Sequence, residues 1–388
     1  MMMLISPPSS FIVCRLIARE ADELPAVPVH GGERWRRPQL LPPPHRHVAL
    51  LLPCIDRGDT DAFDSDGAGA ALPSAIRDGG RLPRPIINLR PPHLQHSAGT
   101  INFALFKNKG NNGGHDMVVA MDNAGRSFIC NPVLPPSVHA LPSLSSPKFA
   151  PFSLTVGDSL YVMDAVPKPP NGCGPHNVEL LSNDDDHGWR WSPLDSPPHV
   201  YDCPGYLCPR IDSYAVVAGA GIAVSNNDSA QTFRFDTGDK TWSKAGDWVL
   251  PFTRLAEYVP EHKLWFGISP IGDGHRFCAA NLVASPDSGQ MRPPVVHGLW
   301  KEYAEPPPEW SVAEAYAVHL GSSRFCIVRL FSTGEIRVET HDSYKVEEEL
   351  QAVVTGVEVQ RCGAELRVVK HKSERYELAA EGDYRILC

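Results

Sequence analysis

From residue 86 onward the chain consists of short apolar runs separated by turn-forming clusters. The runs cover residues 101–106, 117–121, 127–130, 152–156, 160–163, 214–217, 221–224, 232–235, 264–268, 277–282, 325–331 and 336–339. Gly, Asn and Asp stand between many of them, as at 122–125, 157–158 and 237–239. Each run is too short, and too often bounded by Gly or Pro, to form a helix. The pattern predicts an all-β fold built from antiparallel hairpins.

Many of these runs are apolar at every position rather than at alternate positions. Residues 117–121 and 160–163 are entirely apolar. A sheet with one face in water alternates apolar and polar residues, whereas a sheet covered on both faces need not. Each blade of a β-propeller is packed between two neighbours, so the pattern favours a propeller over a β-sandwich.

A degenerate repeat supports the same fold. Hairpin, Gly-containing turn, apolar strand, polar loop and Trp recur in this order over residues 152–191, 214–242 and 258–300, and again from Tyr316. A period of about 40 to 55 residues is in the range of propeller blades. We therefore expect about six four-stranded blades, five of them readable in the sequence.

Three long sequence segments resemble those of a known family. They are residues 146–163 (SPKFAPFSLTVGDSLYVM), 233–267 (FRFDTGDKTWSKAGDWVLPFTRLAEYVPEHKLWFG) and 354–376 (VTGVEVQRCGAELRVVKHKSERY). They closely resemble a cereal-plant family, domain of unknown function 1668, over the chain from Leu94 to its C-terminus. The resemblance implies a kelch-like β-propeller with no assigned catalytic activity. Because the family has no established site residues, no catalytic, cofactor-binding or metal-binding residue is assigned here, and no cofactor is expected.

The first 85 residues have a different composition. They include three consecutive prolines at 42–44 and an Asp-, Gly- and Ala-rich stretch at 56–71. Such segments bury too little apolar surface to offset the entropy of ordering the chain. We expect a poorly ordered Pro-rich N-terminal segment over 1–85 and the propeller over 86–388.

Closure of the ring is the open question of this fold. Strands at 353–359 and 366–369 are expected to form half of the last blade. A weak strand such as 11–17 or 48–52 would have to supply the rest, or the last blade is incomplete. A ring that joins its two ends protects its strand edges, and an open ring leaves them unpaired.

Charge and cysteine content limit the class of protein. The net charge of −9 argues against a general nucleic-acid binder, and the basic group 370–375 is short and interrupted by Glu374. No apolar run reaches the eighteen residues of a membrane-spanning helix. Cys130, Cys278 and Cys326 lie in apolar runs, which predicts buried free thiols in a reducing compartment. We expect a cytoplasmic or nuclear protein, or an organellar one if residues 1–18 are a transit peptide.

One motif is typical of a serine hydrolase. Gly157-Asp158-Ser159-Leu160 matches the nucleophile motif of a plant hydrolase family, and Asp184 with His187 has the spacing of its acid–base pair. However, no βαβ pattern surrounds the motif. A two-residue hairpin turn at Gly157-Asp158, with Ser159 beginning the next strand, is the simpler interpretation.

Two other groups of residues could form ligand sites. Asp184, Asp185, Asp186 and His187 could bind a divalent cation, and Cys173, His176, His187 and Cys203 could bind zinc, but the spacings favour solvated loops. Seven Trp residues could line a carbohydrate site, although packing between blades is favoured. They are Trp189, Trp191, Trp242, Trp248, Trp265, Trp300 and Trp310.

The sequence thus favours a non-catalytic protein-interaction scaffold. Loops on a rigid frame commonly carry binding, and the long loops 166–177 and 285–295 would supply the surface. The alternatives are a serine hydrolase that uses Ser159 and a carbohydrate-binding propeller. The expected partner is a protein of unknown identity, with neither nucleic acid nor membrane involved.

Overall fold

The computed structural model consists of strands joined by turns. It describes residues 2–6, 10–14, 48–51, 77–81, 85–89, 100–107, 116–132, 135–169, 176–184, 187–201, 209–217, 220–283, 291–300, 307, 309–339, 344–363, 365–378 and 385–387. Within them, the only helices are two single 3₁₀ turns, η1 (Pro198–Val200) and η2 (Ile271–Asp273). The all-β prediction is confirmed.

Residues 101–194 form two four-stranded antiparallel meanders. Sheet I contains β6 (Ile101–Phe106), β7 (Met117–Asp122), β8 (Ser127–Asn131) and β9 (Ser137–Leu141). Sheet II contains β10 (Pro151–Val156), β11 (Ser159–Asp164), β12 (Val178–Asp184) and β13 (Gly188–Leu194). Each strand pairs with the next one in the chain, which is the order that consecutive hairpins produce.

Sheets III and IV repeat this order and are joined to each other. Sheet III contains β14 (Ser213–Val217), β15 (Gly221–Asn226), β16 (Gln231–Asp236) and β17 (Thr241–Gly246). Sheet IV contains β18 (Thr253–Val259), β19 (Leu264–Ile268), β20 (Phe277–Asn281) and β21 (Val295–Trp300). The first strands of the two sheets, β14 and β18, pair in parallel over three residues.

Sheet V corrects two expectations from the sequence. It contains β22 (Ser311–Gly321), β23 (Arg324–Glu339), β24 (Tyr344–Cys362), β25 (Glu365–Glu377) and the N-terminal strand β4 (Arg77–Arg81). The runs 325–331 and 336–339 form one strand, β23, because a bulge after Ser332 lets pairing with β24 continue. The expected half blade at 353–359 and 366–369 is also wrong, because these residues pair with β23 and complete sheet V.

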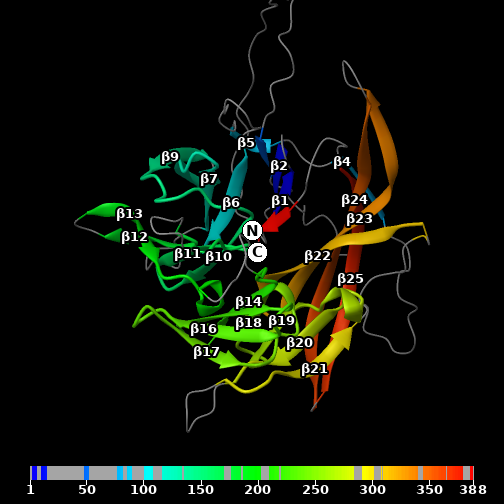
Figure 1. Ribbon diagram of the computed structural model, residues 1–388. Coiled ribbons are helices and arrows are strands. Elements are labelled where there is room, and N and C mark those ends of the chain that lie inside the picture. Colours follow the sequence, from blue (N-terminus) through cyan, green and yellow to red (C-terminus); the bar gives the residue numbers. More distant parts are fainter. Residues whose placement is uncertain are drawn as a thin grey trace, which may run out of the picture.

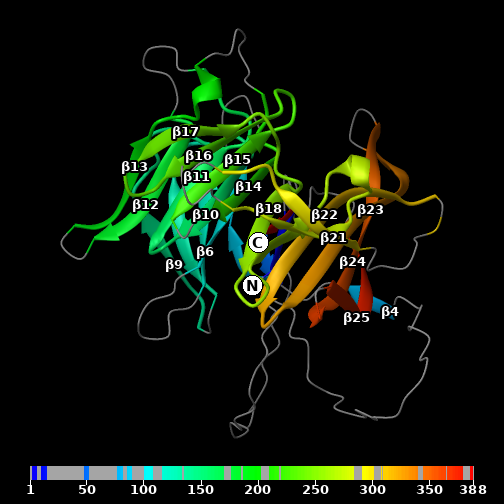
Figure 2. The same ribbon diagram turned by 90° about the horizontal axis from the view of Figure 1, so that it is seen from below.

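The first strand of each sheet lies toward the middle of the molecule. Figure 1 shows β6, β10, β14, β18 and β22, here called the inner strands, around a common centre, with β9, β13, β17, β21 and β25 at the periphery. Figure 2 shows sheets I and II on the opposite side of the molecule from sheet V. Consecutive sheets arranged in this way resemble the blades of a propeller.

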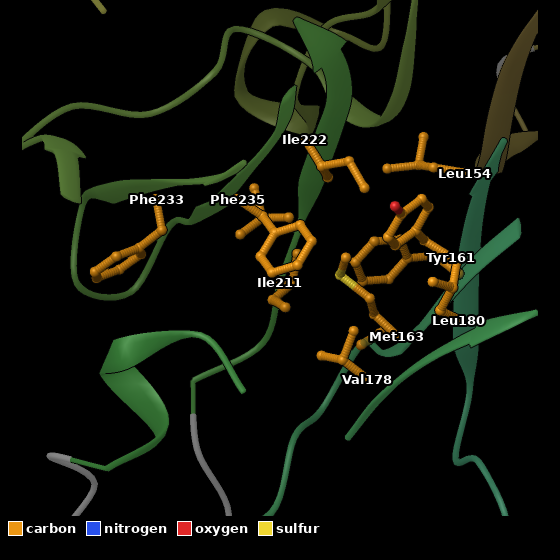
Figure 3. Packing of buried hydrophobic residues seen from close by; sticks show 12 residues of the cluster. Leu154, Tyr161, Met163, Val178, Leu180, Ile211, Ile222, Phe233 and Phe235 are labelled. Carbon is orange, nitrogen blue, oxygen red and sulfur yellow. The ribbon is translucent and has the colours of Figure 1, made fainter. Parts of the chain in front are cut away.

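The cores lie between successive sheets. In β11, Leu160 and Val162 pack against sheet I, whereas Tyr161 and Met163 pack against sheet III. Figure 3 shows the second of these cores, in which Tyr161 and Met163 face Phe235 of β16. Because alternate residues of one strand enter two different cores, the strand is apolar at every position. This confirms the interpretation of the two-faced apolar runs.

The two ends of the chain meet in one small sheet. β1 (Met2–Ser6) pairs with β2 (Ser10–Cys14) on one side and with β26 (Arg385–Leu387) on the other. These strands lie between β6 and β22 (Figure 1), and β26 contacts β6. A second pair, β3 (Val48–Leu51) with β5 (Pro85–Leu89), lies beside β2. Both weak segments named from the sequence, 11–17 and 48–52, therefore contribute strands. Of residues 1–85 the structure describes only 2–6, 10–14, 48–51, 77–81 and 85, so the expectation of a poorly ordered segment falls mostly outside the described residues.

Candidate functional site

All five inner strands run in the same direction. Phe152 and Tyr214, each the second residue of its strand, stack at 4.1 Å between ring centroids. At the other end, the Lys107 amide after β6 donates to Thr155 Oγ1 of β10 at 3.0 Å. We call the side where the inner strands begin the start face and the side where they finish the end face.

A charged cluster lies at the start face. Arg254 of β18 donates from Nη2 to Glu314 Oε1 at 2.6 Å and from Nη1 to Tyr316 Oη at 2.9 Å. Tyr316 also donates to Glu314, and the guanidinium carbon lies 4.9 Å from the Tyr316 ring centroid. Arg254 and Glu314 are 29% and 28% exposed, so the pair joins sheets IV and V while it remains open to solvent.

The backbone of Arg254 is held in an unusual conformation. Its φ is +66°, in the left-handed region that non-glycine residues rarely adopt. Its amide donates to the Asp212 carbonyl at 2.6 Å, and the pairing of β18 with β19 is irregular from Thr253 to Glu257. Backbone strain of this kind concentrates at functional sites.

The surroundings keep Arg254 charged and His275 neutral. Burial alone would lower the pKa of Arg254, but Tyr316 and Glu314 raise it above its ordinary value. Burial lowers the pKa of His275, and the charges of Arg329 and Arg254 lower it further. Near neutral pH the start face therefore presents a charged guanidinium at Arg254 and an uncharged imidazole at His275.

A second charged cluster joins three sheets at the end face. Lys107 from sheet I donates to Glu257 of β18, and the His319 amide of β22 donates to Glu257 Oε2 at 2.9 Å. Burial would raise the pKa of Glu257, but the Lys107 ammonium and these hydrogen bonds hold it below its ordinary value. The carboxylate is thus an ionised link between sheets that lie far apart in the sequence.

Sheet II contains a buried ion pair near the start face. Lys148 and Glu179 have no exposed side-chain surface, and Lys148 Nζ lies 2.5 Å from Glu179 Oε1. Lys148 also donates to the His176 carbonyl at 2.6 Å, and Glu179 accepts from the Ser145 and Ser146 amides. A buried charge requires such complete pairing. The network anchors the segment before β10 to sheet II.

The anchored segment presents an aromatic side chain to solvent. The Phe149 amide donates to Asp164 Oδ1 at 2.5 Å, and the Phe149 side chain is 64% exposed. Burial raises the pKa of Asp164 to about 7, and the hydrogen bond from Phe149 and the charge of Lys148 limit the rise. Two more exposed apolar residues, Tyr201 and Ile271, lie in start-face connections between strands, at 57% and 76% exposure.

The predicted hydrolase residues share one end of sheet II without forming a triad. Gly157 has φ +59°, and Val156 pairs with Ser159, which confirms the two-residue hairpin turn. Ser159 pairs with Ser182, two residues before Asp184, and His187 Nδ1 lies 3.3 Å from Asp184 Oδ2. Within the described residues, no hydrogen bond joins Ser159 to His187. The Asp184 and His187 side chains are 42% and 72% exposed.

The metal and loop predictions fall partly outside the described residues, which exclude Asp185, Asp186, Cys173 and Cys203. In the part of the chain that the structure describes, no three His, Cys, Asp or Glu side chains form a group that could hold a metal ion. The loop 166–177 leaves sheet II at the start face, whereas 285–295 leaves β20 at the end face. The strands that flank the two loops therefore reach them at opposite faces.

The Trp residues pack between sheets, as the interpretation of the repeat predicts. Trp191 donates from Nε1 to Ser127 of sheet I at 3.0 Å, and Trp242 donates to the Asp195 carbonyl after sheet II at 2.8 Å. Trp265 donates to the Val216 carbonyl of sheet III at 2.7 Å. Each of these Trp residues thus forms a hydrogen bond that links its sheet to the preceding sheet or to the segment that follows it.

The prediction that three cysteines of the apolar runs are buried is confirmed. Cys130, Cys278 and Cys326 are buried thiols that form no disulfide within the described residues. Burial raises the pKa of Cys130 to about 12, so this thiol is not ionised near neutral pH.

Sequence reasoning did not identify the charged residues of the two clusters. Their signal is a charged side chain inside an otherwise apolar strand, as in TRLAEYV at 253–259. Such a residue can point to solvent or to a partner, and only the packing of several sheets brings Arg254 to Glu314. Sequence spacing alone could not pair residues that are 60 positions apart.

The fold and the clusters define an all-β, propeller-like repeat protein with charged groups on its inner strands. The chain belongs to the family described as "Protein of unknown function (DUF1668)", whose family model matches residues 42–376. The matched region begins before β3 and β4 and so includes strands of the Pro-rich segment. Among the described residues, no helix is long and apolar enough to span a membrane.

Comparison with other proteins gives distant likenesses. A search of curated proteins found no match. An auxiliary nutrient binding protein from Bacteroides ovatus has a TM-score of 0.36 and 11% identity, with 70% of this chain and 56% of that chain covered. The WD40 domain of SCAP from fission yeast has a TM-score of 0.35 and 9% identity, with 78% and 76% covered. A protein from Lactobacillus plantarum has a TM-score of 0.35 and 10% identity, with 74% and 98% covered.

Proposed function

We propose that this chain is a kelch-like β-propeller of six blades that acts as a non-catalytic protein-interaction scaffold. Sheets I to V supply five blades. The sixth combines β26 with β1 and β2 and takes in β3 and β5. A rigid ring of this kind supports binding by the connections at one of its faces.

The start-face cluster is the observation that carries the proposal. Arg254 and Glu314 form a partly exposed ion pair at the point where the inner strands begin, and the backbone of Arg254 is strained there. The end face, in contrast, is bridged by Lys107 and Glu257. We therefore assign partner binding to the start face, where Phe149, Tyr201 and Ile271 provide apolar contact area.

The partner is best sought by affinity purification from plant extract with mass spectrometry. The triple variant F149S/Y201S/I271S removes exposed start-face groups and should lose a partner that the parent chain retains. The matched control V283S/L320S changes exposed apolar residues at the end face and should retain it. The proposal fails if the parent retains no specific protein, or if both variants retain it equally.

A serine hydrolase is the rival function, because Asp184 and His187 contact each other at the end of sheet II that carries Ser159. A fluorophosphonate probe distinguishes the two functions. The scaffold proposal expects no labelling of the parent chain. Labelling that Ser159→Ala abolishes would establish the hydrolase instead.

A further inference from the structure

The edge of sheet V is covered by a strand from the N-terminal segment. Residues Arg77–Arg81 form β4 and pair in parallel with β25. Among the sheets in the described residues, sheet V alone adds a strand from a distant part of the sequence to a four-stranded meander. Unpaired strand edges readily accept another strand, so a protein either covers them or uses them for binding.

The charges of β4 and β25 are complementary in register. Arg77 lies opposite Glu374, Asp78 opposite Arg375, and Arg81 opposite Glu377. Opposite charges at facing positions stabilise strand pairing, whereas like charges destabilise it. In the backbone register, each of the three charged residues of β4 is therefore paired with a residue of opposite charge.

A bulge in β4 produces this match. The register shifts between Arg375 and Tyr376, so that Tyr376 faces Gly80 and Gly79 is the additional residue. Without the shift, Glu377 would face Gly80 rather than Arg81. Gly is the residue that most readily occupies a bulge.

The pairing is short and should be displaceable. The segment Arg-Asp-Gly-Gly-Arg contains residue types that form strands poorly. It covers only Glu374–Glu377, and within the described residues no strand pairs with the outer side of 365–373. A longer extended segment with the same charges would therefore form more backbone hydrogen bonds than β4 does.

We propose that the outer edge of β25 is a docking site for an extended peptide segment with a basic–acidic–x–x–basic charge order. Residues 77–81 occupy this site within the chain and leave it when such a segment from a partner protein binds. The site lies at one edge of the molecule (Figure 2), so the proposal does not depend on partner binding at the start face.

The in-chain contact is tested first, by hydrogen exchange with mass spectrometry on the full chain. Amides of residues 77–81 should be protected in the parent and exchange at least about 10-fold faster in E374R/E377R, because two facing pairs become like-charged. Protection should return in the fourfold variant R77E/R81E/E374R/E377R. Glu365→Arg makes the same change outside the β4 register and should leave protection unchanged.

The docking site is tested next, with a fluorescent peptide of residues 74–84, SAIRDGGRLPR. In the variant R77E/R81E, residues 77–81 are repelled by Glu374 and Glu377, so the site is open. This variant should bind the peptide at least about 10-fold more tightly than it binds the charge-swapped peptide SAIERGGELPR. Binding should weaken as salt is raised. The parent chain should bind the peptide more weakly than the variant, because its site is occupied.

Two results would overturn the proposal. The first is equal exchange of residues 77–81 in the parent and in E374R/E377R, or no recovery in the fourfold variant. The second is protection within the chain together with no peptide binding to R77E/R81E, which would make β4 a permanent part of sheet V. Neither result depends on a start-face partner.

Discussion

At the scale of the residue, the buried polar side chains are the least expected part of the molecule. Four histidines, His199, His262, His275 and His319, are held at lowered pKa, with burial as the largest cause. His319 also faces Lys107, which lowers its pKa further, while Glu257 opposes this effect. These imidazoles remain neutral in the fold at a pH where the unfolded chain binds protons.

Acidification should therefore destabilise the protein through these histidines. The unfolded state takes up protons as the pH falls through the ordinary histidine pKa of 6.5, whereas the folded state does so only at lower pH. The contribution of His319 to the free energy of unfolding should have its full value above pH 6.5 and should decrease as the pH falls below 6.5. The measurement is the urea midpoint of the parent and of His319→Gln between pH 7.5 and 5, and the gap between the two should narrow or reverse as the pH falls. Asp164, whose pKa is raised to about 7, acts in the opposite direction in both chains and cancels in the comparison. A pH-independent gap would contradict the prediction.

The buried ion pair of sheet II allows a second prediction. Lys148→Met should lower the free energy of unfolding by about 3 to 5 kcal/mol, because it leaves the Glu179 carboxyl group buried in the core without its cationic partner. The double variant K148M/E179L should lose less than the single variant, since no isolated charge remains. Denaturant unfolding of the two variants checks this. Equal or additive losses would show that the charge is not the cause.

At the scale of the element, turn chemistry decides where the strands begin. Gly157 has φ +59° in the tight hairpin before Ser159, and no neighbouring atom would contact an added Cβ. Only backbone conformation therefore demands Gly at this position. The same turn explains why the hydrolase-like motif occurs here.

Gly157→Ala should thus destabilise the protein by about 1 kcal/mol, through left-handed strain alone. Gly272, in η2, is the matched control, because it has equal space for a Cβ and no positive φ. Thermal unfolding of both variants should show a lower midpoint only for Gly157→Ala. A similar shift for Gly272→Ala would mean that strain is not responsible.

At the scale of the whole molecule, the chain ends determine whether every sheet is covered. The faces of sheets I and V that point away from their sequence neighbours are nevertheless buried, as Phe103 and Val118 show on one side and Val318 and Val328 on the other. The strands β1, β2 and β26 lie between these two sheets (Figure 1). Their pairing joins the two ends of the chain in this position, and β26 contacts β6 of sheet I.

Truncation of the chain after residue 384 should therefore lower the thermal stability more than the small number of removed residues would suggest. Removing β26 leaves β1 unpaired on one side and uncovers part of β6. A lower thermal midpoint and binding of a hydrophobic dye are expected, as is faster amide exchange in β1. A full-length chain with a short Gly-Ser extension after Cys388 is the control. An unchanged midpoint would show that the terminal strands do not close the fold.

The sequence by itself determined the strands and their two-faced burial. Runs such as 101–106 and 264–268 coincide with β6 and β19, because local apolar pattern and turn residues are short-range properties. It also predicted that Trp residues pack between sheets, as Trp191, Trp242 and Trp265 do. Only the tertiary structure decided which strands share the last sheet, how the termini meet, and that Arg254 faces Glu314. These features depend on contacts between residues far apart in the chain, and β4 is the clearest case, since Arg-Asp-Gly-Gly-Arg contains residue types that form strands poorly and yet pairs with β25.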